Sequence, residues 1–167
     1  MDALETLFTR RSIRQYTDEP VAEEDLKTIL EAGMNAPSAN NRQPWHFLVV
    51  DDREKLDGIM EAHPYAQMLA QAPIAIVVVA DTERSPSYFQ QDCAAAIENM
   101  LLAARALELG TVWCGVYPNK ARVASIAELF DIPEPYKPLA VVALGHPDEE
   151  KGRVDRWSDE KVHKNSW

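Results

Sequence analysis

The sequence predicts a single domain in which helices and strands alternate. Its 167 residues suit one domain with a hydrophobic core. Two short apolar runs, at 74–80 and 139–144, have the composition of buried strands, and other segments repeat apolar residues at helical spacing. No repeat, low-complexity segment or Pro/Gly/Ser-rich linker divides the chain, so we expect residues 1–167 to fold as one unit.

The first third of the chain predicts two helices, a loop and a strand. Residues 2–9 suggest a short helix, and residues 22–34 suggest a second, whose acidic first turn suits the helix dipole. Apolar residues of the second helix recur at the i, i+3, i+4, i+7 spacing of one helical face. The polar, turn-rich stretch 35–44 is expected to be a loop, and 46–50 is expected to be a strand.

The middle third predicts most of the core. Helices are expected at 53–61 and 65–71, separated by a His-Pro pair. The β-branched run 74–80 is nearly all apolar, which is typical of a strand buried on both faces. The alanine-rich stretch 91–109 is apolar nearly all round, so we expect a long helix buried in the core or in an interface.

The last third predicts a strand or extended loop at 112–117, a helix at 120–130 and a buried strand at 139–144. Asn119 is a suitable N-cap for that helix. The charged tail, 148–167, has no core pattern, and a solvated tail is the simplest interpretation. Its large apolar residues are unfavourable in water, however, so we expect the tail to pack on a partner subunit. They are Trp157, Val162 and Trp167.

Composition and charge argue against several classes of protein. Apolar residues make up 46% and charged residues 26% of the chain, ordinary values for a globular protein. No apolar run approaches the ~20 residues that span a bilayer, and the N-terminus lacks the pattern of a signal peptide, so a cytoplasmic protein is the default expectation. The net charge of −10 opposes binding to nucleic acids or anionic membranes, which requires broad positive surfaces.

Neither cysteine nor histidine spacing predicts a disulfide framework or a metal site. The two cysteines, Cys93 and Cys114, are not in a CxxC motif. The four histidines show no HExxH or other paired-ligand spacing. They are His46, His63, His146 and His163.

The most informative local feature is the basic run Arg10-Arg11-Ser12-Ile13-Arg14, in an otherwise acidic chain. The planar fork of arginine suits phosphate, and a serine hydroxyl adds a donor. We expect Ile13 to point inward while its neighbours face a ligand. An isolated run of this kind is more often a solvated basic patch.

Three further segments could line a ligand site. The first is the loop 36–45, whose small residues would let a planar ligand approach the backbone. The second is 110–116, where Gly115 could expose backbone N–H groups to a ligand. The third is 145–147, which is followed by Lys151, Arg153 and Arg156. Taken singly, these segments are equally well explained as a polar loop, a tight turn and the start of a charged tail.

Taken together and in this order, four stretches resemble the FMN-dependent nitroreductase family. They are RRSIRQY at 10–16, APSANNRQPWHF at 36–47, GTVWCG at 110–115 and VVALGHP at 141–147. The first two are the more specific pair. The resemblance covers essentially the whole chain, and the short length resembles the compact branch of the family.

The resemblance implies a fold, a partner and cofactors. The fold would be a three-layer α-β-α sandwich with a mostly antiparallel central sheet, in an intertwined homodimer. FMN would bind at the subunit interface, NADH or NADPH would be a transient reductant, and the tail at 148–167 would pack on the partner subunit.

The resemblance also implies which residues hold the phosphate end of the flavin. Arg10 and Ser12 would hold the phosphate, and Arg11 would lie near the ribityl chain. Arg156, with Arg153 as the second choice, would close over the phosphate.

For the flavin ring, the resemblance implies contacts from both subunits. Arg14 would reach the N1/O2 edge, where positive charge stabilises the anionic reduced flavin. Cys114 and Gly115 would present backbone N–H groups to the N5/O4 edge, and nothing in the sequence activates the Cys114 thiol for catalysis. Many relatives place a polar or cationic residue before the strand at 74–80, where it touches the flavin. In this chain only Gln67 offers a polar group in that region. Residues of the other subunit would pack on the ring: Pro37, Ser38, Ala39 and Asn41.

The implied activity is that of an FMN-dependent NAD(P)H oxidoreductase. A reduced nicotinamide would hand a hydride to flavin N5 and leave. An electron-poor acceptor, such as a nitroaromatic or a quinone, would take its place, which predicts ping-pong kinetics. No side chain need act as a general acid or base. The absence of a GxGxxG motif agrees with a nicotinamide that binds only transiently.

Three alternatives stay open. The same scaffold could host a different flavin reaction, such as enone reduction, reductive dehalogenation or flavin fragmentation. The chain could bind or store flavin with little turnover. It could also be a structural α/β dimer without a cofactor.

Overall fold

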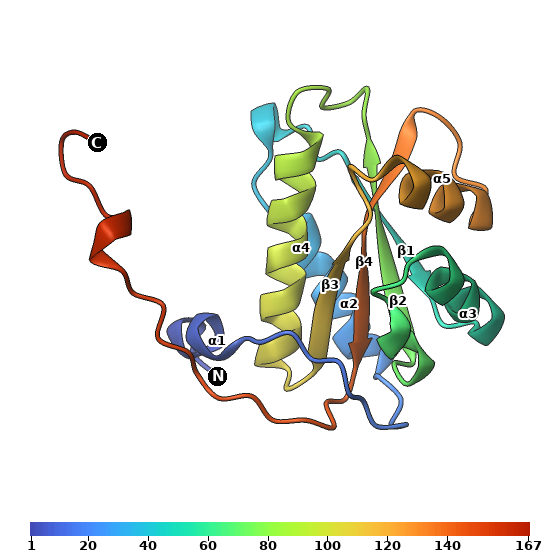
Figure 1. The fold of residues 1–167 in the computed structure, drawn as a ribbon, viewed down its shortest axis with the longest axis horizontal. Helices are drawn as coiled ribbons and strands as arrows, with labels where there is room; N and C mark the ends of the chain where they lie inside the picture. Colours follow the sequence, from blue (N-terminus) through green and yellow to red (C-terminus); the bar gives the residue numbers. More distant parts are fainter.

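A four-stranded antiparallel sheet forms the middle layer of the structure (Figure 1). The computed structural model describes all 167 residues. The strands lie in the order β1-β2-β4-β3, so β2 and β4 are central while β1 and β3 are the edges. The strand bounds are Trp45–Val50 for β1, Ile74–Asp81 for β2, Gly110–Gly115 for β3 and Tyr136–Gly145 for β4.

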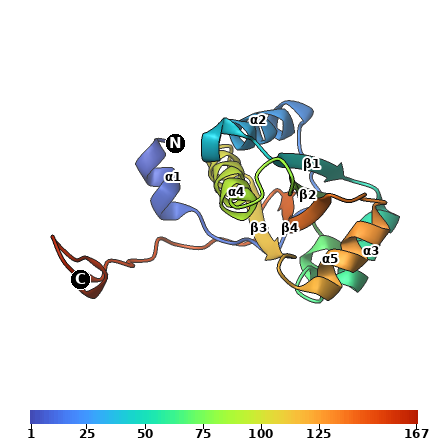
Figure 2. The same ribbon diagram turned by 90° about the horizontal axis from the view of Figure 1, so that it is seen from above.

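Helices cover both faces of this sheet, as Figure 2 shows from above. One face carries α2 and α4, the other face carries α3 and α5, and α1 packs beside α4. The expected three-layer α-β-α arrangement with an antiparallel sheet is therefore confirmed. None of the helices is long and apolar enough to span a membrane. The helix bounds are Ala3–Thr9 for α1, Glu23–Met34 for α2, Arg53–Ala62 for α3, Phe89–Ala106 for α4 and Lys120–Leu129 for α5.

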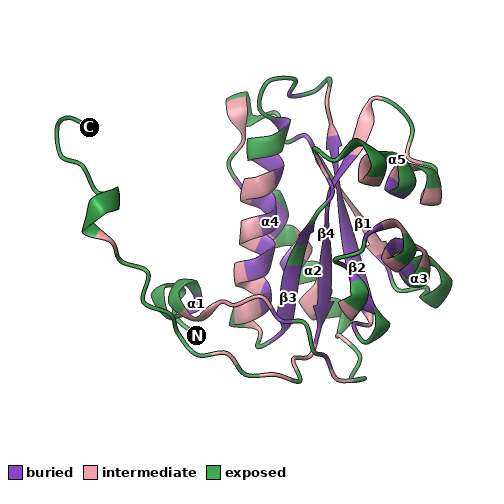
Figure 3. Cartoon of the chain, in the orientation of Figure 1, coloured by how far each residue is buried: buried purple, intermediate pink, exposed green.

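The two central strands are buried on both faces (Figure 3). Ile76 and Val142 face the core beneath α2 and α4, whereas Val77 and Val141 face the core beneath α3 and α5. Because successive residues of a strand point to opposite faces, a strand covered on both sides needs apolar residues at every position. The strands expected at 74–80 and 139–144 are confirmed for this reason, although β4 begins earlier than expected.

α4 is the long helix expected at 91–109, but it begins at Phe89 and ends at Ala106. α2 packs on it so closely that a Cβ on Gly33 would lie 2.8 Å from Cγ of Met100. One face of α4 is buried in the core, through Cys93, Ala96, Ile97, Met100 and Ala104. The opposite face stays partly exposed in the protomer, at Ala95, Glu98, Asn99, Leu102 and Ala103.

The helix expected at 65–71 is confirmed only in part, because it is shorter than expected and is not an α-helix. The stretch is a turn followed by a short 3-10 helix, η2, at Gln67–Ala70. Ala66, Leu69 and Ala72 are completely buried. Their spacing of three residues matches the three residues per turn of a 3-10 helix rather than the 3.6 of an α-helix.

The remaining elements agree with the prediction to within a few residues. β3 begins at Gly110 rather than 112, because Gly110 pairs with Gly145 across the ladder. The loop expected at 35–44 contains a 3-10 turn, η1, at Ala39–Asn41.

The N-terminal segment, residues 10–16, contacts the edge of β3 at Thr111 and then crosses to the residues that follow β4. The Ile13 N–H donates to the Thr111 carbonyl (2.9 Å), and the Tyr16 hydroxyl donates to the Ile13 carbonyl (2.6 Å). The side chains of Ile13 and Tyr16 are buried, as expected for Ile13. A Cβ on Gly110 would lie 2.8 Å from Cγ2 of Ile13, so the segment packs directly on the β3 backbone. This packing fixes the directions of the arginines in the segment.

The tail at 148–167 runs away from the sheet and past α1 (Figures 1 and 2). Apart from a 3-10 turn, η3, at Asp159–Lys161, it has no regular structure. Trp157 is 72% exposed and Trp167 is fully exposed. Packing of this tail on a partner subunit stays a prediction.

We predict that Gly110→Ala destabilises the protein and that Gly115→Ala, at the other end of the same strand, does not. A methyl group at position 110 must displace Ile13, and such overpacking costs about 1–3 kcal/mol. A methyl group at position 115 meets no atom within 4 Å, and neither glycine has a positive φ. Urea unfolding of both variants measures the difference. If the midpoint of Gly110→Ala equals that of the wild type, the segment does not pack tightly on β3.

Candidate functional site

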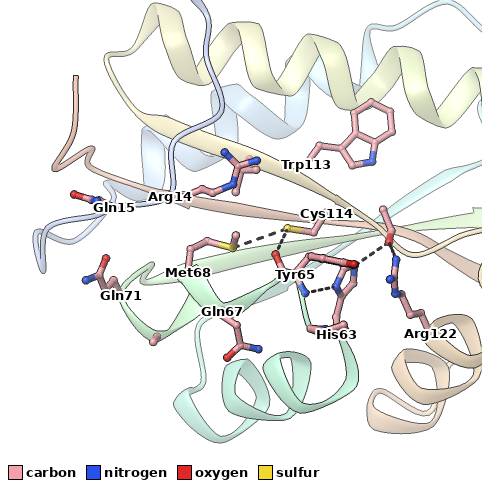
Figure 4. Close-up of a pocket in the computed structure, with 14 residues that line it drawn as sticks. Arg14, Gln15, His63, Tyr65, Gln67, Met68, Gln71, Trp113, Cys114 and Arg122 are labelled. Atoms are coloured by element: carbon pink, nitrogen blue, oxygen red, sulfur yellow. Dashed lines mark hydrogen bonds between the residues drawn. The ribbon is translucent and has the colours of Figure 1, made fainter. Parts of the chain in front are cut away.

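A cavity of about 980 Å³ lies at the end of β3, between that strand, the N-terminal segment and the turn before η2 (Figure 4). Arg14 lines it from the N-terminal segment, Gln67 from η2, and Cys114 and Gly115 from β3. The structure therefore brings together all the residues of this protomer that were expected to contact a flavin ring. Arg122, from α5, lines the same cavity and was not expected.

A second hollow, of about 470 Å³, lies farther along the N-terminal segment. Its lining includes four cations, Arg10, Arg11, Arg105 and Lys151, and we call it the cationic hollow. Because the buried Ile13 separates Arg14 from Arg10 and Arg11, the basic run is divided between the two hollows. The second hollow also contains three acidic residues, which are Asp148, Glu149 and Glu150.

The start of the tail is tied to the N-terminal segment by hydrogen bonds. Arg11 donates from Nη1 to the Gly152 carbonyl (2.7 Å), and Lys151 donates from Nζ to the Ser12 carbonyl (2.7 Å). Oε1 of Glu149 accepts from the Arg14 N–H (2.6 Å) and from Lys151 (2.9 Å), and these bonds hold the pKa of Glu149 below its usual value. The backbone around Ser12 is therefore held from two sides.

Sequence reasoning did not assign Arg105 to this site. Its Nε donates to the Thr9 hydroxyl (3.2 Å), next to Arg10, whose Nε lies 3.7 Å from Oε1 of Glu98. Arg105 stands in the last turn of α4, where a basic residue is already explained by the helix dipole. Only the packing of α1 on α4 reveals that it faces the same hollow as Arg10.

The buried His63 was also missed, and it fixes one wall of the first cavity. Its Nδ1 accepts from the Tyr65 N–H (3.2 Å), so Nε2 carries the proton and donates to the Gly115 carbonyl (2.8 Å). Burial, with a smaller contribution from the charge of Arg122, lowers the pKa of His63. The ring is therefore a neutral tie between the turn before η2 and the end of β3. A lone histidine before a proline carries no sequence signal of this role.

Strand geometry distinguishes Gly115 from Cys114. In an antiparallel ladder, the backbone N–H and C=O groups of successive residues point alternately toward and away from the neighbouring strand. Val116 donates into β4 (3.0 Å), whereas the carbonyls of Thr111 and Gly115 accept bonds from outside the sheet. The backbone of Cys114 therefore faces β4 and that of Gly115 faces the open edge, which favours Gly115 as the donor to a ligand.

The Cys114 thiol is buried in the wall of the cavity. It donates to the Tyr65 carbonyl (3.4 Å), and burial raises its pKa to about 11. The thiol is therefore protonated near neutral pH, which agrees with the expectation that it is not an activated nucleophile.

The loop that carries Pro37, Ser38 and Ala39 lies elsewhere in the protomer. The Ala39 N–H donates to Oδ1 of the buried Asp92 (2.9 Å), near the start of α4. Arg105 follows 13 residues later on the same helix, which corresponds to about 20 Å at 1.5 Å per residue. Within one protomer, this loop is therefore remote from the cationic hollow, and so is Asn41, whose side chain accepts from Gln43 (2.7 Å).

Both tail arginines lie near Arg10 and Arg11 of the N-terminal segment. The guanidinium of Arg153 stacks over the Phe8 ring, 4.4 Å from its centroid. Arg153 and Arg156 line a third hollow together with Arg10 and Arg11.

A model of the nitroreductase family matches residues 7–146. The chain belongs to the nitroreductase family. The expected family and enzyme class, an oxidoreductase of the nitroreductase family, are confirmed by this match and by the relatives described next.

Relatives in the nitroreductase family match the chain along its whole length. One from Methanothermobacter thermautotrophicus, named as a candidate NADH dehydrogenase/NAD(P)H nitroreductase, is 48% identical over 169 residues, covering 100% of this chain and 88% of the relative. A crystal structure of a protein of the same name from Bacteroides thetaiotaomicron has a TM-score of 0.96 at 41% identity, covering 99% of this chain and 98% of that one. A candidate nitroreductase from Desulfovibrio desulfuricans, in complex with FMN, has a TM-score of 0.86 at 34% identity, covering 100% and 98% of the two chains.

The residues of the site suit the cofactor implied by this nitroreductase resemblance. No positive φ requires a glycine at position 115, yet a Cβ there would point into open space. The missing side chain therefore leaves room for a planar group against the edge of β3. The second hollow contains three carboxylates as well as four cations, and its three arginines, Arg10, Arg11 and Arg105, are the donors that suit a phosphate monoester. A molecule with a planar ring at one end and a phosphate at the other, such as FMN, matches these two hollows.

We predict that the free energy of unfolding decreases when the pH is lowered below about 6.5, the ordinary pKa of histidine. Between that pH and the lowered pKa of folded His63, the unfolded chain binds a proton that the folded chain does not, so stability rises with pH in this window. His63→Gln should reduce the dependence. Urea unfolding at about pH 5.5 and about pH 7.5 measures it, and an unchanged slope in the variant would assign the effect to other groups.

Proposed function

We propose that the chain is an FMN-dependent NAD(P)H oxidoreductase that reduces electron-poor acceptors such as nitroaromatics or quinones. The observation that carries this proposal is the division of the N-terminal segment between two adjoining hollows. Arg10 and Arg11 line the cationic hollow, and Arg14 lines the cavity beside the open edge at Gly115. The similarity to a protein in complex with FMN supports the assignment of the cofactor.

In this proposal the cationic hollow binds the phosphate and the ribityl chain. Arg10 and the hydroxyl of Ser12 hold the phosphate, and Arg11 lies near the ribityl chain. Lys151 holds the Ser12 carbonyl (2.7 Å), so the backbone is already fixed before a ligand arrives. Arg105 adds positive charge from α4. Arg153 or Arg156, which line the third hollow together with Arg10 and Arg11, would close over the phosphate from the tail.

The larger cavity binds the ring. FMN would supply the redox chemistry when bound, carrying electrons from NADH or NADPH to the acceptor. Arg14 would lie near the N1/O2 edge of the ring, where its charge would favour the reduced form. The Gly115 N–H would be the donor toward the N5/O4 edge, and Gln67 would offer a further polar contact.

The side chains around the cavity bind and orient rather than exchange protons. Both ring nitrogens of His63 are engaged, and the Cys114 thiol is protonated near neutral pH. One open cavity serves the nicotinamide and the acceptor in turn, so the two substrates bind alternately. Ping-pong kinetics follow from this arrangement.

We further propose that two subunits form a homodimer with two FMN molecules at their interface. The loop with Pro37, Ser38, Ala39 and Asn41 is remote from the cationic hollow of its own protomer, so these residues would face the ring bound by the partner. Apolar side chains near that hollow are exposed, as an interface requires. They include Leu4, Leu7 and Phe8 of α1 and Trp157 of the tail.

The test is an anaerobic titration of the FMN-loaded protein with NADH and then with NADPH. We expect the visible flavin absorption to be bleached by at least one nicotinamide and restored by an acceptor, with parallel double-reciprocal plots at steady state. If FMN binds and neither nicotinamide bleaches it, the chain is a flavin-binding protein and not an NAD(P)H oxidoreductase. If the protein does not bind FMN, the assignment of the cofactor is wrong.

Arg14→Ala provides the matching variant for this titration. A lost charge-assisted contact should weaken FMN binding about tenfold or more and make the midpoint potential of the flavin more negative. Lys27→Ala is the control, because Lys27 is an exposed cation of α2 that pairs only with Glu31. An unchanged potential in Arg14→Ala would contradict the placement of Arg14 at the ring.

We predict that a chain ending at Gly152 associates more weakly than the full chain. It keeps the contacts of Lys151 and Gly152 with the N-terminal segment but loses Trp157 and Trp167. Burial of one large apolar side chain contributes about 1.5–3 kcal/mol, so the dissociation constant of the dimer should rise tenfold or more. Sedimentation over a range of concentrations measures it. A shortened chain that dimerises as tightly as the full chain would show that the tail is dispensable.

A further inference from the structure

The larger cavity carries positive charge although the protein is strongly acidic. The chain has 27 acidic and 17 basic residues, yet the lining of this cavity includes Arg14 and Arg122 and no aspartate or glutamate. Neither guanidinium has a carboxylate within ion-pair distance. Two cations without a counter-charge make this cavity electrostatically favourable for an anion.

Arg122 is held in place at one end of the cavity (Figure 4). It belongs to the first turn of α5, where its backbone N–H donates to the Asn119 side chain (3.1 Å). Its Nη1 donates to the Gly115 carbonyl (3.2 Å), and its guanidinium lies 5.1 Å from the centroid of the Tyr65 ring. A guanidinium has five N–H donors, so most of them stay free for a ligand while the side chain is already ordered.

An exposed aromatic side chain accompanies this arginine. Tyr65 is 69% exposed and lines the cavity, whereas the Trp113 side chain points toward α4, away from Arg122 (Figure 4). Exposed aromatic faces offer flat apolar surface to planar ligands. An ordered guanidinium beside such surface is complementary to an aromatic molecule with an anionic substituent, since carboxylate and arginine form bidentate pairs.

Arg14 and Arg122 have different roles in this arrangement. Under the proposed function, Arg14 is engaged with the edge of the flavin ring. Arg122 enters from α5, on the side of His63 and Tyr65, and has no assigned role (Figure 4). It is therefore the cation available to the molecule that exchanges electrons with the flavin.

We propose that Arg122, held over Tyr65, makes the enzyme prefer aromatic acceptors that carry a carboxylate or a similar anionic group. This inference rests on the proposed function and specifies the class of its acceptor. For the probe 4-nitrobenzoate, one turnover takes a hydride from NADH and one proton from solvent, which reduces the nitro group by two electrons and releases one of its oxygens as water. The products are 4-nitrosobenzoate, NAD⁺ and water.

The experiment compares 4-nitrobenzoate with 4-nitrobenzamide, which has nearly the same size but no charge. Arg122→Gln should lower kcat/KM for the benzoate about tenfold or more, the effect of one charge-assisted contact, and leave the benzamide within about twofold. Arg122→Lys should keep part of the preference, because it keeps the charge and loses the fork. Added salt should lower the preference of the wild type for the benzoate.

Lys120→Gln is the matched control. Lys120 is an exposed cation of the same helical turn and does not line the cavity. It should leave both values of kcat/KM unchanged, and equal melting temperatures of all variants would show that they fold. Equal losses for benzoate and benzamide in Arg122→Gln, or no loss for either, would overturn the inference.

A second measurement separates the acceptor from the nicotinamide, whose phosphates are also anions. Bleaching of the flavin by NADH, followed without an acceptor, should have the same rate and concentration dependence in Arg122→Gln and the wild type. If that step slows instead, Arg122 binds the nicotinamide nucleotide and the preference for anionic acceptors is refuted. Suppose that the wild type reduces both nitro compounds and that Arg122→Gln changes kcat/KM for both equally or for neither. The proposed function then survives, and only this inference fails.

Discussion

The seating of Ile13 on Gly110 is the contact on which the rest of the site depends. Because position 110 has no side chain, the N-terminal segment approaches the β3 backbone closely enough for the Ile13 N–H to bond to Thr111. Once Ile13 points inward, Arg14 is directed into one hollow, and Arg10 and Arg11 into another. The segment also ends its contact with β3 before Gly115, which leaves that part of the strand edge open.

A second fixed point lies at the other end of β3. The Gly115 carbonyl accepts from both His63 and Arg122, so it joins the strand to the turn before η2 and to α5. These donors satisfy the carbonyl of Gly115 and leave its N–H on the open edge. Preorganised backbone groups of this kind need no rearrangement when a ligand binds. β3, the turn before η2 and α5 therefore meet at the Gly115 carbonyl, and together they shape the cavity.

Sequence patterns predicted the layers of the fold well because these depend on local chemistry. β2 and β4 are apolar at every position, since helices cover both of their faces, and the cap at Asn119 marks the start of α5. The stretch 65–71 was expected to form a longer helix, because apolar residues at a spacing of three are close to an α-helical pattern. Its buried positions follow the tighter 3-10 period, which differs by only 0.6 residues per turn.

The site was predicted as far as its residues form a continuous motif. Arg10–Arg14 and Gly115 lie in such motifs, and Gln67 was inferred from a departure from the family pattern. His63, Arg105 and Arg122 were missed because each lies on a separate element, and only tertiary packing brings them to the site. In the proposed homodimer, the role of the loop at 37–41 would depend on a second subunit, which no pattern within one chain can position.

The close packing of the N-terminal segment on β3 also affects how the protein behaves in solution. A strand at the edge of a sheet has unpaired N–H and C=O groups that can pair with another chain and start aggregation. Residues 12–13 occupy this edge at Thr111, and near Gly115 the open remainder lies beside two arginines, whose charge opposes the addition of a foreign strand. Displacement of Ile13 would expose the edge of β3, and it would also remove Arg10, Arg11 and Arg14 from their positions at the two hollows. The same small contact therefore protects the solubility of the protein.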